Sequence, residues 1–445
     1  MSADLAQALL DAARKAGADA ADALVIDGTA LSIDVRQGRL EHAERAESKD
    51  IGLRVLIGQR QACVSSSDTS PATLAAMAER AVAMAREAPE DPFAGLADPA
   101  MLSARRDAEG LELCDPTAEP APAALEDDAR RAEAAALAIA GVSQVDQASA
   151  SYSRRSVFLA ATNGFAGGYT RSSRHVSCVA ITGEGTGMER DWASEGRIFQ
   201  ADLPDAETIG RQAGERAARR KGSRKPPSGV FPVLYDERVS SSLIGHLTGA
   251  INGTTIARGS GWLRDALGKP VLPAGFDLIE DPLRIRATGT RPFDAEGLPT
   301  QRRVWVKDGV LQGWVLDLAT ARKLGMQSTA NASRGPTAPP SPSLSNLDLT
   351  QGARSREELL RDMGTGLLVT SLIGSTINPT TGDYSRGASG FWVENGAIAY
   401  PVNECTIAGN LRDMLMRITA ANDARPHLST RVPSLLVEGL TLAGA

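Results

Sequence analysis

Histidine and cysteine are scarce in this sequence, and each scarcity narrows the classes of protein it can be. The 445 residues include four histidines and four cysteines. Because histidine is the commonest metal ligand in proteins, a metal site built by this chain would have very few residues to draw on. No two cysteines form a CxxC pair, which argues against a zinc ribbon or a disulfide framework. We therefore expect free thiols and a reducing, cytoplasmic compartment. The cysteines are Cys63, Cys114, Cys178 and Cys405.

Long apolar runs and a strong charge of one sign are also lacking. No window approaches the ~18 consecutive apolar residues that a membrane-spanning helix needs. The first 20 residues have neither the basic nor the apolar region of a signal peptide. A net charge of −6 gives no electrostatic reason to expect DNA or a lipid surface as the main partner. The one basic cluster, residues 219–229, is typical of a solvated linker.

The patterns that are present predict an α+β fold in two parts. Five short strand-like segments between residues 22 and 67, separated by breaks at glycine or charged residues, predict an antiparallel meander with covering helices. Ser70 and Pro71 mark the start of one such helix, because serine caps helices and proline suits the first helical position. The stretch 219–229 cannot continue a helix, so we place a domain boundary there. The sequence thus predicts an N-terminal α+β domain, 1–222, and a β-rich C-terminal domain, 228–445.

Three dipeptides predict tight turns between strands. Asn163-Gly164, Asp308-Gly309 and Asn395-Gly396 each follow one strand-like run and precede another. Such pairs favour hairpins, because both residues tolerate the positive φ angles of the turn.

The sequence contains neither the GxSxG motif of serine hydrolases nor a complete phosphate-binding loop. Ser389 lies in Gly387-Ala388-Ser389-Gly390, which lacks the GxSxG spacing and precedes a strand, so we interpret it as a turn or close-packing residue. The glycines at 183, 185 and 187 lack the lysine of a phosphate loop and predict a hairpin tip. The four histidines are far apart, and the neighbours of His246 one helical turn away are Ser242 and Ala250. We expect no self-contained metal site in this chain.

One long segment near the C-terminus resembles a known family. Residues 375–415, STINPTTGDYSRGASGFWVENGAIAYPVNECTIAGNLRDML, are similar to the C-terminal signature of the TldD/PmbA family, also named modulators of DNA gyrase. Residues 35–68 resemble the N-terminal meander of that family, and residues 161–169, ATNGFAGGY, resemble its hairpin. The resemblance covers nearly the whole chain.

The resemblance implies a particular kind of subunit. In this family a TldD-type subunit carries an HExxxH helix and a later cysteine that hold a metal, and a PmbA/TldE-type subunit shares its fold. Here Gly245, His246 and Ala250 stand at the positions of the first histidine, the glutamate and the second histidine. No HExxxH occurs anywhere in the sequence, and Cys405 lies outside residues 423–433, where the cysteine ligand is expected. The chain therefore resembles the PmbA/TldE-type member, with no metal of its own and zinc in a TldD-type partner.

The leading hypothesis is a cytosolic heterodimeric zinc metallopeptidase that degrades peptides or unfolded protein segments. This chain would help to hold an extended peptide, which commonly binds by adding a strand to a sheet. Gly387, Ser389 and Gly390 are candidate contacts, because glycine permits close backbone approach. An alternative is a non-enzymatic protein that regulates another assembly such as DNA gyrase. A third hypothesis is cleavage by the isolated chain, with His246 as the residue to test.

Overall fold

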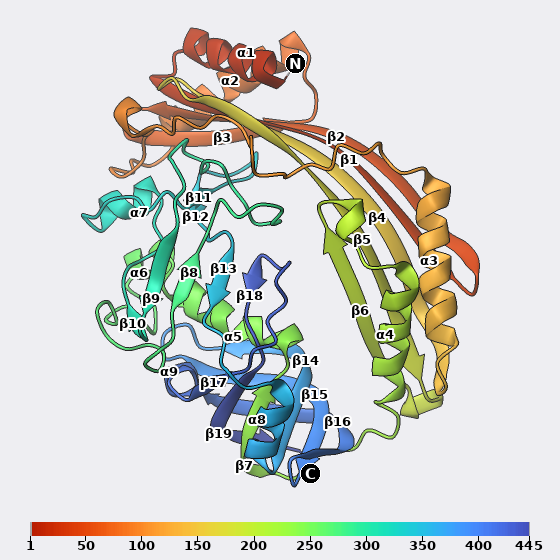
Figure 1. Ribbon diagram of the computed structural model, residues 1–445. Coiled ribbons are helices and arrows are strands. Elements are labelled where there is room, and N and C mark those ends of the chain that lie inside the picture. The colour runs from red at the N-terminus through yellow and green to blue at the C-terminus, as the bar shows by residue number, and fades with distance from the viewer. Residues whose placement is uncertain (1, 445) are drawn as a thin grey trace.

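The N-terminal half is built on one six-stranded antiparallel sheet. The computed structural model describes residues 2–444, and the sheet has the strand order β3-β2-β1-β4-β5-β6. Figure 1 shows its long strands arching beside the C-terminal half. The strands are β1 (Ala20–Arg36), β2 (Arg39–Ile57), β3 (Arg60–Ser66), β4 (Val142–Ala161), β5 (Ala166–Thr182) and β6 (Glu189–Arg197). Short 3₁₀ turns lie at Pro99–Met101, Gly185–Gly187 and Gln200–Asp202.

The prediction of five short strands between residues 22 and 67 is wrong, because two long strands, β1 and β2, and the short strand β3 occupy this region. Gly28 and Gly52, two of the expected breaks, lie inside β1 and β2. A Cβ added to Gly52 would come within 2.4 Å of the Pro336 carbonyl oxygen, and one added to Gly28 within 3.3 Å of that of Arg154. These glycines mark close approaches between backbones rather than strand ends.

Four helices cover one face of the sheet. On β1, Ala23 and Val25 pack in a core with α1 and α2, while Leu31 and Ile33 pack in a core with α3 and α4. Alternate residues of a strand share a face, so all four helices lie on the same side. The opposite face meets the C-terminal half at Leu24, beside Phe293. The helices are α1 (Ser2–Ala16), α2 (Pro71–Glu87), α3 (Pro122–Leu137) and α4 (Ala206–Ala218).

The sequence signals for α2 are confirmed. Ser70 occupies the N-cap position and accepts a hydrogen bond from the backbone amide of Thr73, and Pro71 is the first helical residue. The mixed α+β class is confirmed as well, since an antiparallel sheet precedes a β-rich half.

Residues 219–228 connect the first sheet to the C-terminal half, and their cations contact other parts of this chain. Arg220 is 3% exposed, and its Nε lies 3.6 Å from a carboxylate oxygen of Glu189. The guanidinium of Arg224 lies 3.6 Å from the centre of the Tyr400 ring, and that of Arg219 lies 5.1 Å from the centre of the Phe391 ring. The basic cluster thus stabilises the connection between the two halves.

The C-terminal half contains a closed ring of five strands. Sheet order is β16-β15-β14-β7-β19-β17, and β16 also pairs with β19. Only β7 and β14 are parallel neighbours in this sheet. Helices α5 (Glu237–Ala250), α8 (Arg356–Met363) and α9 (Leu411–Leu415) pack against the barrel. The strands are β7 (Gly229–Tyr235), β14 (Gly366–Ile377), β15 (Asp383–Glu394), β16 (Ala397–Asn410), β17 (Ile418–Ala420) and β19 (Leu435–Ala443).

A second small sheet lies between the barrel and the first sheet (Figure 1). Its order is β10-β9-β8-β13-β18, and most of it comes from the segment between α5 and β14. Its strands are β8 (Leu278–Glu280), β9 (Arg303–Lys307), β10 (Val310–Leu311), β13 (Leu347–Leu349) and β18 (Thr430–Arg431). The same region holds α6 (Gly253–Ala257), α7 (Leu318–Lys323) and the pair β11 (Ala332–Ser333) and β12 (Ser341–Pro342).

Hairpins form at all three predicted positions, and two of them have the predicted two-residue turn. Asp308 and Gly309 have φ angles of 48° and 78°, and Asn395 and Gly396 have 53° and 74°. Both central residues of each of these two turns are therefore left-handed, as a hairpin of this type requires. Gly164, with φ of 95°, lies in the connection from β4 to β5.

No helix within residues 2–444 is long and apolar enough to cross a membrane.

Candidate functional site

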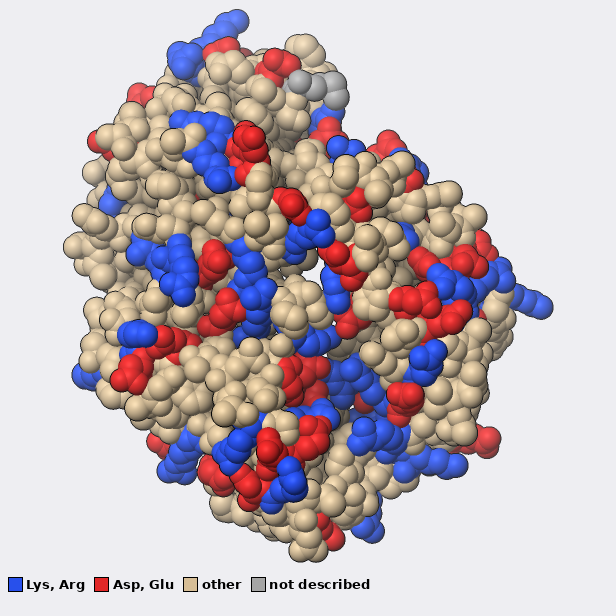
Figure 2. Space-filling view, in the orientation of Figure 1, with Lys and Arg blue, Asp and Glu red and all other residues tan. Residues whose placement is uncertain are grey.

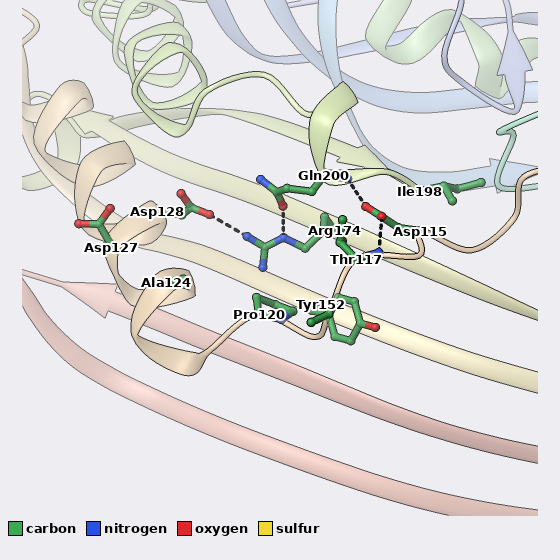
Figure 3. Close-up of a pocket in the computed structure, with 11 residues that line it drawn as sticks. Asp115, Thr117, Pro120, Ala124, Asp127, Asp128, Tyr152, Arg174, Ile198 and Gln200 are labelled. Atoms are coloured by element: carbon green, nitrogen blue, oxygen red, sulfur yellow. Dashed lines mark hydrogen bonds and ion pairs between the residues drawn. The ribbon is translucent and has the colours of Figure 1, made fainter.

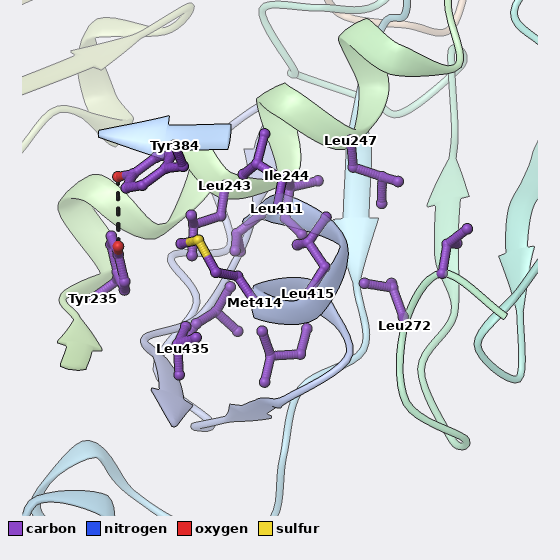
Figure 4. Packing of buried hydrophobic residues seen from close by; sticks show 14 of the residues in the cluster. Tyr235, Leu243, Ile244, Leu247, Leu272, Tyr384, Leu411, Met414, Leu415 and Leu435 are labelled. Atoms are coloured by element: carbon purple, nitrogen blue, oxygen red, sulfur yellow. Dashed lines mark hydrogen bonds between the residues drawn. The ribbon is translucent and has the colours of Figure 1, made fainter. Parts of the chain in front are cut away.

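Helix α5 separates the barrel core from an open surface. It begins after Asp236, whose side chain accepts a hydrogen bond from the Arg238 amide. One face of the helix is apolar and packs with α9 (Figure 4). Gly245 and Gly249 lie on the other face, are exposed, and would place an added Cβ more than 4 Å from any non-local heavy atom. Gly245 and Gly249 thus form an open stripe on the helix, a strip of surface with no side chains and no packed neighbour. Its buried residues are Ser240, Leu243, Ile244, Leu247 and Ala250.

Gly245, His246 and Ala250, which stand at the positions of the HExxxH residues, lie in different surroundings. Gly245 is exposed, His246 is half-buried, and Ala250 is 4% exposed within the barrel core. The imidazole of His246 packs edge-on against Tyr384, with ring centres 5.8 Å apart. Its Nε2 is buried and has no hydrogen-bond partner in the described structure. Of the three, only His246 brings a polar side chain to this region.

His246 is held in its neutral form. Burial and the nearby guanidinium of Arg386 lower its pKa from the ordinary value of 6.5. Beneath it, the hydroxyls of Tyr235 and Tyr384 are 3.4 Å apart (Figure 4). Burial raises the pKa of both phenols. Both phenols are buried, and neither they nor the imidazole supplies a carboxylate to take a proton from water.

A network of ion pairs connects the start of α5 to β6 and to the segment before β18. Arg425 lies 2.8 Å from a carboxylate oxygen of Glu237 and 3.2 Å from one of Glu195. The Nε2 atom of His427 lies 3.1 Å from Glu195, and Arg238 lies 2.9 Å from Asp191. Sequence reasoning missed this network, because its members come from segments that are far apart along the chain. The only local signal was the charged start of α5.

Gly387, Ser389 and Gly390 lie inside β15, which pairs with β14 on one side and β16 on the other. A Cβ added to Gly390 would come within 1.9 Å of the Leu368 carbonyl oxygen of β14. Ser389 is 7% exposed and occupies no turn. The close approach that these glycines permit is therefore that of the chain's own strand, and β15 has no free edge for a peptide.

A free edge does exist on the neighbouring strand. β7 pairs with β14 only over Leu367–Val369, and no other strand among residues 2–444 pairs with β14 on that side. Residues 373–376 are exposed, and Ile373 is 70% exposed. Helix α5 packs beside this strand. Helix α5, which carries the open stripe, thus lies beside the strand that carries the unpaired edge.

Comparison with known families gives matches along most of the chain. Three models match in order: "PmbA/TldA metallopeptidase domain 1" at residues 21–85, "central domain" at residues 115–221 and "C-terminal domain" at residues 228–444. "Metalloprotease PmbA" of Escherichia coli O157:H7 is 36% identical over 427 residues, which cover 96% of this chain and 92% of that protein. The chain belongs to the PmbA/TldD family.

Further relatives of the PmbA/TldD family agree with this assignment. A "Metalloprotease PmbA homolog" of Haemophilus influenzae is 34% identical over 98% of this chain and 94% of its own length. A "Metalloprotease TldD homolog" of the same organism is 25% identical over 54% of this chain and 50% of its own length.

Solved structures show the same fold. One from Bacteroides thetaiotaomicron, provisionally described as a modulator of DNA gyrase, has a TM-score of 0.91 and 27% identity, and the match covers 99% of this chain and 98% of that one. TldE from Thermococcus kodakarensis has a TM-score of 0.85 over 99% of this chain and all of its own, and at 18% identity it supports the fold alone.

The residues at the metal-helix positions of this PmbA/TldD family member do not fit a metal ion. Gly245 and Ala250 offer no donor atom, and His246 is a single imidazole. Within residues 2–444, no group of three or more His, Cys, Asp or Glu side chains is placed to hold one. Catalytic zinc needs about three protein ligands and a position for water.

Cys405 does not complete such a site either. Its thiol is 3% exposed and donates to the Ala388 carbonyl oxygen, with an Sγ–O distance of 3.2 Å. Burial raises its pKa to about 11, so the thiolate that binds metals is disfavoured. Residues 423–433, where the family cysteine is expected, do run beside α5: Ser240 Oγ lies 3.4 Å from the Val432 carbonyl oxygen. That segment supplies His427, which faces Glu195.

Proposed function

We propose that this chain is the metal-free, PmbA/TldE-type subunit of a heterodimeric zinc metallopeptidase, and that a TldD-type partner supplies the metal and the base. The observation that carries the proposal is a complete family fold whose metal helix has no ligands. Its reaction is hydrolysis of peptides or unfolded protein segments. The four cysteines of the chain are free, which supports a reducing, cytoplasmic compartment for the complex.

The role of this chain is to hold the extended substrate. The exposed edge of β14, residues 371–377, offers unpaired backbone groups of the kind that bind a peptide as an added strand. The stripe formed by Gly245 and Gly249 leaves room for that peptide beside α5. This edge replaces Gly387, Ser389 and Gly390 as the candidate peptide contact.

The decisive experiment compares this chain alone, a TldD-type partner alone, and both together. We expect zinc to copurify with the partner and peptide cleavage to require the partner's HExxxH glutamate. Substantial zinc and cleavage by this chain alone would overturn the proposal. Recovery of the chain with a nucleic-acid enzyme, without any effect on cleavage, would favour the regulatory alternative.

A second experiment tests the peptide path. Gly245→Trp fills the open stripe of α5 without a core clash, because nothing lies within 4 Å of its Cβ position. We expect the complex to keep its zinc and lose most of its cleavage of extended peptides. Gly187→Trp is the matched control, since Gly187 is equally open but lies in the connection from β5 to β6. Equal activity of the two variants would contradict a path beside α5.

A further inference from the structure

A pocket of about 340 Å³ lies against the N-terminal sheet, and its lining includes no residue of α5 (Figure 3). Its walls come from the start of α3, the segment before that helix, strands β4 and β5, and the 3₁₀ turn after β6. Pro120, Ala124, Tyr152 and Ile198 supply an apolar side. This volume suits a small molecule rather than a long peptide.

Arg174 forms the polar side of the pocket. It is 6% exposed, its Nη2 lies 2.9 Å from a carboxylate oxygen of Asp128, and its Nε donates to the side-chain oxygen of Gln200. Its Nη1 is buried and has no hydrogen-bond partner in the described structure. Figure 3 shows this third nitrogen directed toward the Pro120 side. A buried guanidinium N–H without an acceptor is costly, so this nitrogen is a donor for a group that enters the pocket.

The first turn of α3 borders the same pocket and has no side-chain cap. Ala121 is the N-cap residue and makes no side-chain cap hydrogen bond, and Pro122 at the first helical position has no N–H. The amides of Ala124 and Leu125 donate to the Ala121 carbonyl oxygen, at 2.9 Å and 3.4 Å. The Ala123 amide of this 16-residue helix is therefore the one in the first turn that has no acceptor in the described structure. Helix N-termini favour anionic groups. The uncapped helix and Arg174 are independent features that border one pocket.

The other charges define which anion fits. Asp115, Asp127 and Asp128 line the pocket with Arg174 as the one cation. This excess of carboxylates repels a dianion such as phosphate. It favours a ligand whose carboxylate is balanced by an ammonium group. The apolar side adds room for a hydrocarbon side chain.

We propose that this pocket binds a small zwitterion: the carboxylate end of an apolar amino acid or short peptide, with Arg174 and the α3 N-terminus on the carboxylate. The ammonium group faces the aspartates, and the side chain lies against Tyr152 and Ile198. The site does not depend on the proposed peptidase role, because binding is a property of this chain alone.

The segment before α3 is the part that adjusts when the ligand enters. Residues 116–119 are exposed and have no regular secondary structure. Asp115 anchors the segment by accepting from the amides of Thr117 and Gln200, at 2.9 Å and 2.7 Å. Displacing Pro120 uncovers Nη1 and leaves this anchor in place.

The test is calorimetric titration of the full chain with L-leucine, alanyl-leucine, leucinamide, N-acetyl-leucine and inorganic phosphate. We expect saturable binding of leucine or alanyl-leucine, and the tighter of the two identifies an amino acid or a peptide end. Leucinamide lacks the carboxylate and N-acetyl-leucine lacks the ammonium, so each binds about tenfold more weakly or worse. Binding of N-acetyl-leucine or phosphate as tight as that of leucine, or no saturable binding at all, would overturn the proposal.

Two variants locate the site. Ala124→Leu fills the pocket from an exposed position of α3, and we expect affinity to fall about tenfold or more. Ala134→Leu, also exposed on α3 but outside the pocket, leaves affinity unchanged. Arg174→Met abolishes binding, and circular dichroism checks its folding. Unchanged affinity of the Ala124 variant would refute the assignment even if the Arg174 variant is unstable.

Discussion

The first sheet meets the C-terminal half at two junctions of opposite character. Near β1 and β2, Asp22 lies between Arg54 and Arg334, and all three side chains are at most 4% exposed. Near β6, Glu195 contacts Arg425, which also contacts Glu237, and these side chains are 14% to 27% exposed. Figure 2 shows acidic and basic side chains around an opening in the surface between the two halves. One junction is dry and the other is partly solvated.

The difference indicates where the molecule can adjust. A buried charge that loses its partner is expensive, so the Asp22 junction has one stable arrangement. Partly solvated ion pairs exchange with water at small cost. The second junction includes the start of α5, the helix that carries part of the candidate peptide surface, whereas the Asp22 junction includes no residue of α5.

Breaking the dry junction gives the largest expected effect. Asp22→Asn removes the charge and leaves Arg54 and Arg334 buried without the carboxylate that contacts both. We expect a loss of about 3–5 kcal/mol in the free energy of unfolding, measured by denaturant titration. Asp11→Asn, in a surface pair whose side chains are more than half exposed, changes it by about 0.5 kcal/mol or less. Equal losses in the two variants would contradict the distinction between dry and solvated contacts.

Gly52→Ala tests the same junction through packing. Its Cβ would lie 2.4 Å from the Pro336 carbonyl oxygen, so backbone must shift on one side of the contact. We expect a loss of about 1–3 kcal/mol, seen as a lower melting temperature. Gly187→Ala meets no atom within 4 Å and serves as the control. If both variants melt at the wild-type temperature, the sheet and the Pro336 segment are not in firm contact.

Glu195→Gln tests the solvated junction. The substitution keeps the shape of the side chain and removes the charge that pairs with Arg425 and Arg197. We expect a loss of about 1 kcal/mol at low salt and less at high salt, because ions screen partly exposed pairs. The melting temperature at several salt concentrations measures the effect. A large loss that is independent of salt would place this junction in the same class as Asp22.

The pH dependence of stability is a further test of the solvated junction, which contains His427. Burial and then Arg197 lower the pKa of His427 below its ordinary 6.5, although Glu195 opposes them. A lowered folded-state pKa gives stability that is present above pH 6.5 and lost as the pH falls through the folded value. We expect His427→Gln to flatten this decline by about 1 kcal/mol or less. Stability that rises between neutral and mildly acid pH would contradict the sign.

The sequence predicted local features of the fold well and long-range ones poorly. The Ser70 cap and the Asp308-Gly309 turn follow from neighbouring residues, so their chemistry is readable along the chain. Gly28 and Gly52 resemble breaks in the sequence because the reason for each lies in another segment, at Arg154 and Pro336. A glycine needed for a distant contact looks the same in sequence as a glycine that ends a strand.

The candidate site also combines features that can be predicted locally with features that depend on distant segments. Gly245, His246 and Ala250 are found through a local motif, and the structure places them on one helix. The free edge of β14 could not be predicted, because it depends on where β7 stops pairing. Gly390 is a candidate peptide contact in the sequence for its lack of a side chain, but that space is filled by β14. The sequence alone does not show which segment of backbone will pack against a given glycine.

Gly245→Ala has the smallest expected effect and separates folding from function most cleanly. The residue is exposed in mid-helix with nothing within 4 Å of an added Cβ, so alanine should raise the free energy of unfolding by about 0.5 kcal/mol through helix propensity. A glycine that weakens its helix and packs against nothing has no structural reason to be there. If the stripe admits a substrate, the complex reconstituted with the Gly245→Ala variant should bind extended peptides more weakly while melting slightly higher. Higher stability with unchanged peptide binding would show that the open stripe of α5 is incidental.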